Sequence, residues 1–428
     1  MSTLAPAELV ERIWQRDPSV WTGQDEAQWL GWLDEPARMR ERVHELMEFG
    51  ASVDVDDVVL LGMGGSSLAP EVMRRLFRAE RFHVLDTTHP TAIRRLEEAI
   101  DLERTLFVAA SKSGTTIETR SQTDYFRDKG GRFAVITDPG SPLADVSDHL
   151  FYGEPTIGGR YSALSVFGIL PAVFMGIDAI RLLDRAEEMR EACRLEEGNP
   201  GLELGLELAE RTFLRVEGDF GLWVEQLVAE STGKEGKGIV PVWSGGEPAE
   251  VRLPDPYEVG QEFFRWEFAT AVAGSLLGIN PFDQPDVQAA KDKTNALLSR
   301  RDRGPGPQLG PEGTLEELLA EATPDHYVAI LAFIDPARED ELEPFIRQAE
   351  ETGSPVAVGL GPRYLHSTGQ LHKGGPDNGL FVQVVDDLGY ELKIPDKPYG
   401  FKTLIAAQAL GDFEALRERG RRIVRVQL

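Results

Sequence analysis

The chain has 428 residues, 41% of them hydrophobic, which is enough for two or three domains with sizeable cores. Its formal net charge of -27 argues against nucleic acid or an anionic membrane surface as its main partner. The single cysteine, Cys193, excludes a disulfide scaffold, and the first residues contain no secretory signal, so we expect a cytoplasmic protein.

Strand-like and helix-like stretches alternate from residue 57 onward. The apolar, strand-like runs lie at 57–62, 82–86, 105–111 and 133–137, and amphipathic helical stretches lie at 70–80 and 91–100. This alternation predicts an α/β fold with a doubly wound, mainly parallel sheet and helices on both faces.

The longest apolar stretch, 164–177, contains Pro171 and is too short to span a bilayer. We therefore expect a buried helix there and no membrane partner. Long linking helices are predicted for 179–210.

The alternation resumes in the second half of the chain. Strand-like runs lie at 211–217, 238–243, 327–334, 355–361, 380–386 and 422–428, with helical stretches at 220–231, 257–278, 338–353 and 400–419. We expect a helical segment at 1–50, a first domain at 51–195, and a second domain with helical extensions at 196–428.

A glycine cluster, "GMGGSS", follows the first strand and precedes a helix. Backbone N–H groups at such a turn, with the dipole of the helix, favour an anion such as phosphate. Dinucleotide and Walker-type loops do not fit, because Ser67 stands where the former needs glycine and no Gly-Lys pair follows. Gly65 and Ser66 are therefore candidates to bind a small phosphate. The alternative is a tight turn with a serine as helix cap.

The segment "SKSGTT" follows the third strand and opens another helix. Ser111, Ser113 and Thr116 offer hydroxyl donors, and Lys112 offers a compact cation, as a phosphate monoester requires. The alternative is a hydroxyl-rich helix start with Lys112 in solvent.

Two charged residues are candidates for chemistry on a bound substrate. Arg160 stands beside a glycine pair in "GGRYS", where it could stabilise an oxyanion. Glu230 lies at the end of a predicted helix, beside a turn that contains Lys234 and Lys237, and could act as a base. The alternative for both is a solvated surface residue.

The segment "NPFDQPDVQAAK" contains Gln284 and Lys291, seven positions apart. Residues at this spacing share one helix face, so both side chains could point into one site. The alternative is a capped helix start with Lys291 in solvent.

His366 and His372 lie in a glycine-rich stretch that we expect to be a loop between strands. Histidines in loops are candidates for function. A metal site is disfavoured here, because the spacing is six and no cysteine or third ligand is evident.

Five segments, taken in order, resemble the phosphoglucose isomerase family, most closely the isomerase portion of bacterial transaldolase/phosphoglucose isomerase fusion proteins. They are "GMGGSSLAP", "SKSGTTIET", "GGRYS", "ESTGK" and "NPFDQPDVQAAK". The resemblance implies two sugar-isomerase-type α/β/α sandwich domains. No separate transaldolase-like barrel fits in the rest of the chain, so the chain resembles the isomerase part alone.

The resemblance also assigns roles. It implies that Glu230 is the general base, that Arg160 stabilises an enediolate, and that Gln284 and Lys291 are polar residues around the sugar. The residues that would hold the phosphate are Ser66, Ser111, Ser113 and Thr116. Lys112 would contribute to phosphate binding through its backbone and its electrostatic field more than through a direct contact.

One departure concerns the histidine that opens the sugar ring. The family has a Gly-Gln-His block between the glutamate and the "NPFDQ" segment, but residues 232–279 contain no histidine. The similar string "STGQLHKGG" comes after that segment instead. We expect His372 to open the ring, with His366 in reserve.

The expected activity is glucose-6-phosphate isomerase, acting on a sugar-phosphate substrate through a cis-enediol intermediate with no metal and no cofactor. Two alternatives are a dual-specificity phosphoglucose/phosphomannose isomerase and a non-catalytic sugar-phosphate sensor. A homodimer and a functional link to a transaldolase stay open.

Overall fold

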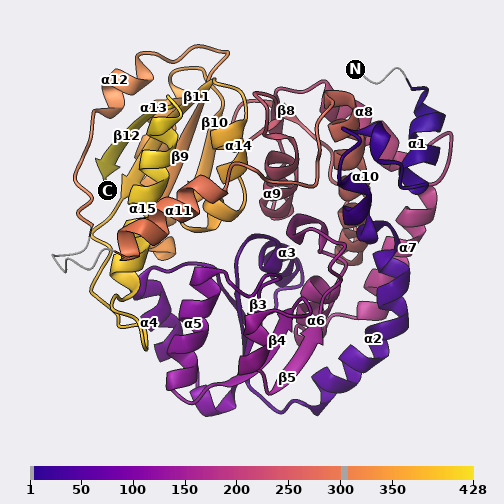
Figure 1. Ribbon diagram of the computed structural model, residues 1–428, viewed down its shortest axis with the longest axis horizontal. Helices are drawn as coiled ribbons and strands as arrows, with labels where there is room; N and C mark the ends of the chain where they lie inside the picture. The colour runs from indigo at the N-terminus through magenta and orange to yellow at the C-terminus, as the bar shows by residue number, and fades with distance from the viewer. Residues whose placement is uncertain (1–3, 300–306) are drawn as a thin grey trace.

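The computed structural model describes residues 4–299 and 307–428, and Figure 1 shows how the elements are arranged. Its first sheet contains five parallel strands in the order β2-β1-β3-β4-β5. The strands are β1 (Asp57–Gly62), β2 (Phe82–Leu85), β3 (Thr105–Ala110), β4 (Arg132–Thr137) and β5 (His149–Tyr152).

Every residue of β1 and β3 is buried, as expected for central strands covered on both faces. In their register Gly62 lies opposite Ala110, so the loops that follow the two strands leave the sheet side by side. The helices that connect the strands and follow the sheet are α3 (Leu68–Leu76), α4 (Pro90–Ala99), α5 (Ile117–Asp128) and α6 (Val166–Phe174).

The C-terminal sheet is also parallel, in the order β10-β9-β11-β12. Its strands are β9 (Tyr327–Phe333), β10 (Val356–Leu360), β11 (Gly379–Val385) and β12 (Arg422–Gln427). The helices in this part of the chain are α11 (Gln288–Ser299), α12 (Leu315–Leu319), α13 (Glu343–Glu350), α14 (Gly369–Gly374) and α15 (Phe401–Glu418).

A third, small parallel sheet, β7-β6-β8, lies beside the C-terminal sheet. The N–H of Trp243 donates to the carbonyl of Val356, at 2.6 Å, and so joins the end of β7 to β10. The strands are β6 (Phe213–Arg215), β7 (Val240–Val242) and β8 (Glu247–Pro248).

Most of the remaining helices form one side of the molecule, at the right of Figure 1, whereas α9 lies near the centre of that view. Helix α10 is nearly all buried and packs against α8 and α7, because apolar side chains cover it on all sides. The helices are α1 (Pro6–Trp14), α2 (Glu35–Ser52), α7 (Ala179–Ala192), α8 (Pro200–Ala209), α9 (Gly221–Thr232) and α10 (Val259–Leu277).

The predicted alternation of strands and helices is confirmed in both halves of the chain, including the buried helix that contains Pro171. One expectation is wrong. The stretch around His366 and His372 is not a loop: it forms the 3-10 helix η10 (Arg363–His366) and helix α14. Within the described residues, no helix has the length and apolar character that crossing a membrane requires.

Candidate active site

Helix α9 places two polar side chains one turn apart, Gln226 and Glu230. The Glu230 side chain is only 12% exposed. The amide Nε2 of Gln226 donates to Glu230 Oε2 at 3.0 Å and to the carbonyl of His366 at 2.8 Å. Because the Nε2 group of this amide donates to both acceptors, its orientation is set and it fixes the direction of the carboxylate.

Arg160 lies on the 3-10 helix η7 (Gly159–Tyr161), and its side chain is 2% exposed. Its guanidinium donates four hydrogen bonds, of 2.7 to 2.9 Å, to Ser231 Oγ, Gln284 Oε1 and the carbonyls of Pro281 and Asp283. A guanidinium has five N–H groups, so one N–H, on Nη1, has no acceptor among the described residues. Nη1 lies 3.8 Å from Glu230 Oε2.

Two glycines bring the first loop against these elements. A Cβ on Gly65 would lie 2.0 Å from the carbonyl oxygen of Gly159. A Cβ on Gly64 would lie 2.5 Å from the carbonyl oxygen of His366, and Gly64 also has a φ of +53°, which favours glycine. The glycine cluster therefore serves close packing around the site.

His366 pairs with a buried carboxylate. Its Nε2 lies 2.8 Å from Glu118 Oε1, in the first turn of α5. Burial raises the pKa of Glu118, but the charge and hydrogen bond of His366 outweigh it, and the net shift of this pKa is downward. The carboxylate stays ionised near neutral pH and orients the imidazole.

These side chains surround one cavity of about 170 Å³. Of the predicted residues, the structure brings together Gly65, Arg160, Glu230, Gln284 and Lys291, together with His366. The full lining is Met63, Gly64, Gly65, Gly159, Arg160, Gln226, Glu230, Gln284, Val287, Lys291, Leu365 and His366.

Gln284 and Lys291 both line the cavity, but not from one helix. Helix α11 begins at Gln288, so the expected common helix face is wrong for Gln284. Gln284 is instead held by Arg160 at 2.8 Å. Lys291 lies on α11, and its ammonium has no hydrogen bond or ion pair to any residue within 4–299 and 307–428. Its positive charge lowers the pKa of Glu118.

A second lysine, Lys234, is buried behind Arg160. Its ammonium donates to Asp283 Oδ1 and to the carbonyls of Asn280 and Asp283, at 2.6 to 2.7 Å. Burial, and then the charge of the neighbouring Arg160, lower the pKa of Lys234 to about 8, although Asp283 and Glu230 oppose the shift. Lys234 therefore fixes the "NPFDQ" segment under Arg160.

The expected phosphate residues lie beside the cavity, in the two loops that follow β1 and β3, and apart from Gly65 they are not among its lining. Ser66 is buried, and its hydroxyl has no hydrogen bond to a described residue. Ser111 Oγ lies 2.9 Å from Thr116 Oγ1, and Ser113 Oγ lies 2.9 Å from Thr115 Oγ1.

Lys112 is turned away from these hydroxyls. Its ammonium donates to Asp138 Oδ1 at 2.8 Å and to the carbonyl of Glu154 at 3.0 Å. This carboxylate compensates the charge of Lys112, so the structure does not provide a free cation at the position.

His372 does not reach the cavity, which corrects our first choice for the ring-opening residue. It is buried on α14, its Nδ1 lies 3.1 Å from the Tyr327 hydroxyl, and its ring packs on Phe381. Burial, then the charges of Lys373 and Arg421, hold the pKa of His372 well below its usual value. The ring is therefore neutral and part of the core.

Two residues at the site were not predicted, Glu118 and Gln226. Gln226 stands four positions before Glu230, so the two share one helix face. This spacing could have predicted that Gln226 lies at the same site. Glu118 lies two positions after the hydroxyl cluster, but its pairing with His366 joins segments 248 positions apart. No local pattern predicts such a pair. Within the described residues, no group of three His, Cys, Asp or Glu side chains is arranged to hold a metal ion.

Comparison with known proteins gives consistent matches. A family model described as phosphoglucose isomerase matches residues 36–200. A glucose-6-phosphate isomerase from Carboxydothermus hydrogenoformans is 32% identical over 398 residues, covering 63% of this chain and 85% of that protein. One from Thermus thermophilus is 36% identical over 190 residues, covering 40% of this chain. That match spans 46% of the Thermus protein, less than half of its length.

Among solved structures, a glucose-6-phosphate isomerase from Chlamydia trachomatis matches with a TM-score of 0.53 and 19% identity, over 69% of this chain and 79% of that chain. At this identity the match concerns the fold alone. It agrees with the α/β architecture and parallel sheets described above.

Proposed function

The chain belongs to the phosphoglucose isomerase family, and from this membership we propose that it interconverts glucose 6-phosphate and fructose 6-phosphate. The observation that supports this most directly is the placement of the Glu230 carboxylate 3.8 Å from the Arg160 guanidinium at one cavity. An aldose–ketose isomerisation requires a general base to move a proton and a fixed cation to stabilise the negative charge that develops.

Glu230 transfers the proton. In the open-chain sugar, the hydrogen on the carbon next to the carbonyl is acidic, and its removal gives an enediolate. The carboxylate takes this proton from one of C1 and C2 and returns it to the other, while the hydroxyl proton of the enediol passes between the oxygens of C1 and C2. The amide of Gln226 holds the carboxylate in place, so little reorganisation is needed between the two steps.

Arg160 stabilises the negative charge that develops on the oxygens of C1 and C2. Its four hydrogen bonds fix the guanidinium before substrate arrives, and its remaining Nη1 hydrogen is available to the enediolate. A donor that is already oriented costs no reorganisation when charge develops.

His366 opens the sugar ring, in place of His372. Ring opening needs a group that gives a proton to the ring oxygen and accepts one from the C1 hydroxyl near neutral pH. His366 lines the cavity and is oriented by Glu118. The ammonium of Lys291, which has no partner among the described residues, binds sugar oxygens, and Gln284 positions both Arg160 and the sugar.

The loops after β1 and β3 bind the phosphate, with Ser66, Ser111, Ser113 and Thr116 as donors beside the N-terminus of α5. We expect Ser66→Ala to raise KM roughly tenfold with little change in kcat, because one hydrogen bond to a charged group is lost. Steady-state kinetics with fructose 6-phosphate measure this.

Ser67→Ala is the matched control, because the Ser67 hydroxyl donates inward to the carbonyl of Gly64. It should leave KM nearly unchanged. An unchanged KM in Ser66→Ala, together with a sulfate-soaked crystal in which neither loop holds an anion, would contradict this phosphate site.

The direct test of the activity is a coupled assay of the purified protein with fructose 6-phosphate and no added metal. We expect glucose 6-phosphate to form, and activity to survive overnight chelation in full, since every step above uses only protein side chains. An activity loss that zinc restores would contradict the metal-free mechanism.

Several finer statements belong to the same proposal. The sequence motifs support a likeness to the isomerase portion of transaldolase/phosphoglucose isomerase fusions. The single cysteine supports a cytoplasmic location, and a homodimer and a functional link to a transaldolase stay open. We also propose the domain division at 1–50, 51–195 and 196–428.

A further inference from the structure

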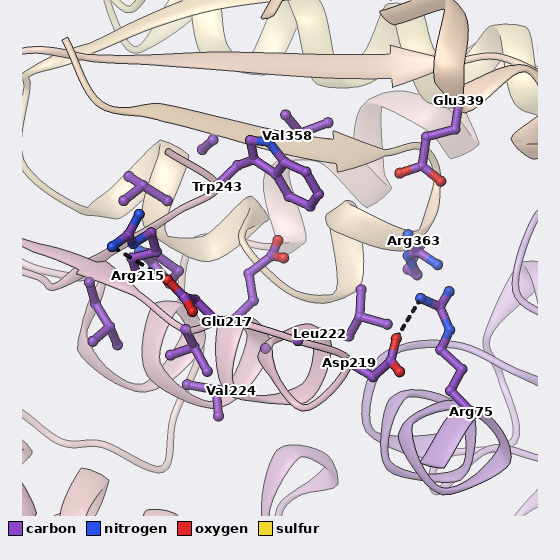
Figure 2. Close-up of a pocket in the computed structure, with 18 residues that line it drawn as sticks. Arg75, Arg215, Glu217, Asp219, Leu222, Val224, Trp243, Glu339, Val358 and Arg363 are labelled. Carbon is purple, nitrogen blue, oxygen red and sulfur yellow. Dashed lines mark hydrogen bonds and ion pairs between the residues drawn. The ribbon is translucent and has the colours of Figure 1, made fainter. Parts of the chain in front are cut away.

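A second cavity, of about 700 Å³, lies on the other side of α9 and shares no lining residue with the reaction cavity. Figure 2 shows its walls: Trp243 and Val358 on one side, Leu222 and Val224 of α9 below, and Arg75 and Asp219 at one end with Arg363 and Glu339. Nothing in the isomerase reaction uses these side chains.

An exposed indole forms part of this cavity. Trp243 is 69% exposed, although its backbone is fixed by the hydrogen bond to Val356. A large exposed aromatic residue among the lining of a cavity presents a π-face to a ligand.

The positive charges that line the cavity are already paired. Arg75 lies 2.6 Å from Glu71 and 3.3 Å from Asp219. Arg215 lies 3.4 Å from Glu217. Arg363 lies 3.4 Å from Asp86.

Two lining carboxylates, in contrast, have no such partner. Among the described residues, neither Glu225 of α9 nor Glu339 of the 3-10 helix η9 (Pro336–Leu342) has a side-chain hydrogen bond or an ion pair within 4 Å. The cavity therefore has spare negative charge and no spare cation, which disfavours a phosphate or carboxylate ligand.

Glu225 is the more informative of the two, because it is partly buried. Burial raises the pKa of Glu225 to about 7; Arg363 opposes this shift, and Glu339 adds to it. The other charged groups that line the same space are the paired Arg75, Arg215, Glu217 and Asp219. A cation bound beside Glu225 would compensate a carboxylate that is poorly compensated in the free protein.

We propose that this cavity is a second binding site, separate from the isomerase site, for a small organic ammonium ion. The cation lies against the face of the Trp243 indole and between the carboxylates of Glu225 and Glu339. An aromatic face combined with carboxylates is the arrangement that recognises organic ammonium groups. The apolar body of the ligand packs on Leu222, Val224 and Val358.

Isothermal titration calorimetry with choline chloride tests this proposal. The matched uncharged ligand is 3,3-dimethyl-1-butanol, which has choline's shape with carbon in place of nitrogen. We expect choline to bind the wild-type protein at least about tenfold more tightly than the alcohol, because a cation–π contact and a carboxylate both require the charge. Potassium chloride at the same ionic strength is the blank.

Trp243→Ala and Glu225→Gln should each weaken choline binding by about tenfold. Glu316→Gln, at an exposed position on α12, is the control variant and should bind as wild type. The proposal is wrong if choline gives no heat up to about 10 mM, or if choline and the alcohol bind equally. It is also wrong if Trp243→Ala converts a dimer to a monomer by sedimentation, because a second copy would then cover the indole.

Discussion

Glu230→Gln is expected to lower kcat for fructose 6-phosphate by at least about a hundredfold, because general-base catalysis typically contributes that much or more. The amide keeps the size of the side chain and can still accept the hydrogen bond from Gln226. It cannot take a proton from carbon. Substrate binding should change little, so the loss should appear in kcat and not in KM.

Helix α9 offers a matched control for this variant. Glu225 is another glutamate on the same helix, but it lines the second cavity and not the reaction cavity. Glu225→Gln should therefore retain kcat. Proton exchange at C2, followed by NMR in D2O, should be lost in Glu230→Gln along with turnover. Near wild-type kcat in Glu230→Gln would remove Glu230 from the mechanism.

Much of the fold follows from local pattern. Fully buried runs such as 57–62 and 105–110 form central parallel strands because continuous apolar stretches can be covered on both faces. The glycine cluster after β1 was predicted as a ligand-binding turn, and Gly65 indeed lines the reaction cavity. Glu230 and Arg160 were predicted as site residues from their local settings, at a helix end and beside a glycine pair, and both line the same cavity.

The local pattern could not predict the surroundings of several side chains, because contacts between distant segments determine them. His366 and His372 stand six positions apart in one glycine-containing stretch. One imidazole reaches Glu118 across the site, whereas the other packs into a core of aromatic rings. The glycines suggested a loop, but tertiary packing made this stretch helical, and burial holds the pKa of His372 well below its usual value. The ion pair of Lys112 could not be predicted locally either, because its partner Asp138 lies beyond the next strand.

The two histidines also give the second large expected effect. His366→Asn should slow turnover of cyclic glucose 6-phosphate by roughly a hundredfold, the lower range for acid–base catalysis. Proton exchange at C2 of an acyclic aldose phosphate, which needs no ring opening, should fall much less. The two rates are measured on the same preparation, by a coupled assay and by NMR in D2O.

His372→Asn separates a role in chemistry from a role in packing. Its ring has no access to the reaction cavity, and it lies among Tyr327, Tyr364 and Phe381. This variant should lower the melting temperature, because a buried aromatic contact and the hydrogen bond to Tyr327 are weakened. The ratio of the cyclic to the acyclic rate should stay at the wild-type value.

If His372→Asn lowers that ratio and His366→Asn does not, then His372 opens the ring and the assignment to His366 is wrong. Equal losses on both substrates in His366→Asn would instead mean that this imidazole acts after ring opening, with Glu118 holding it for proton transfer at C1 and C2.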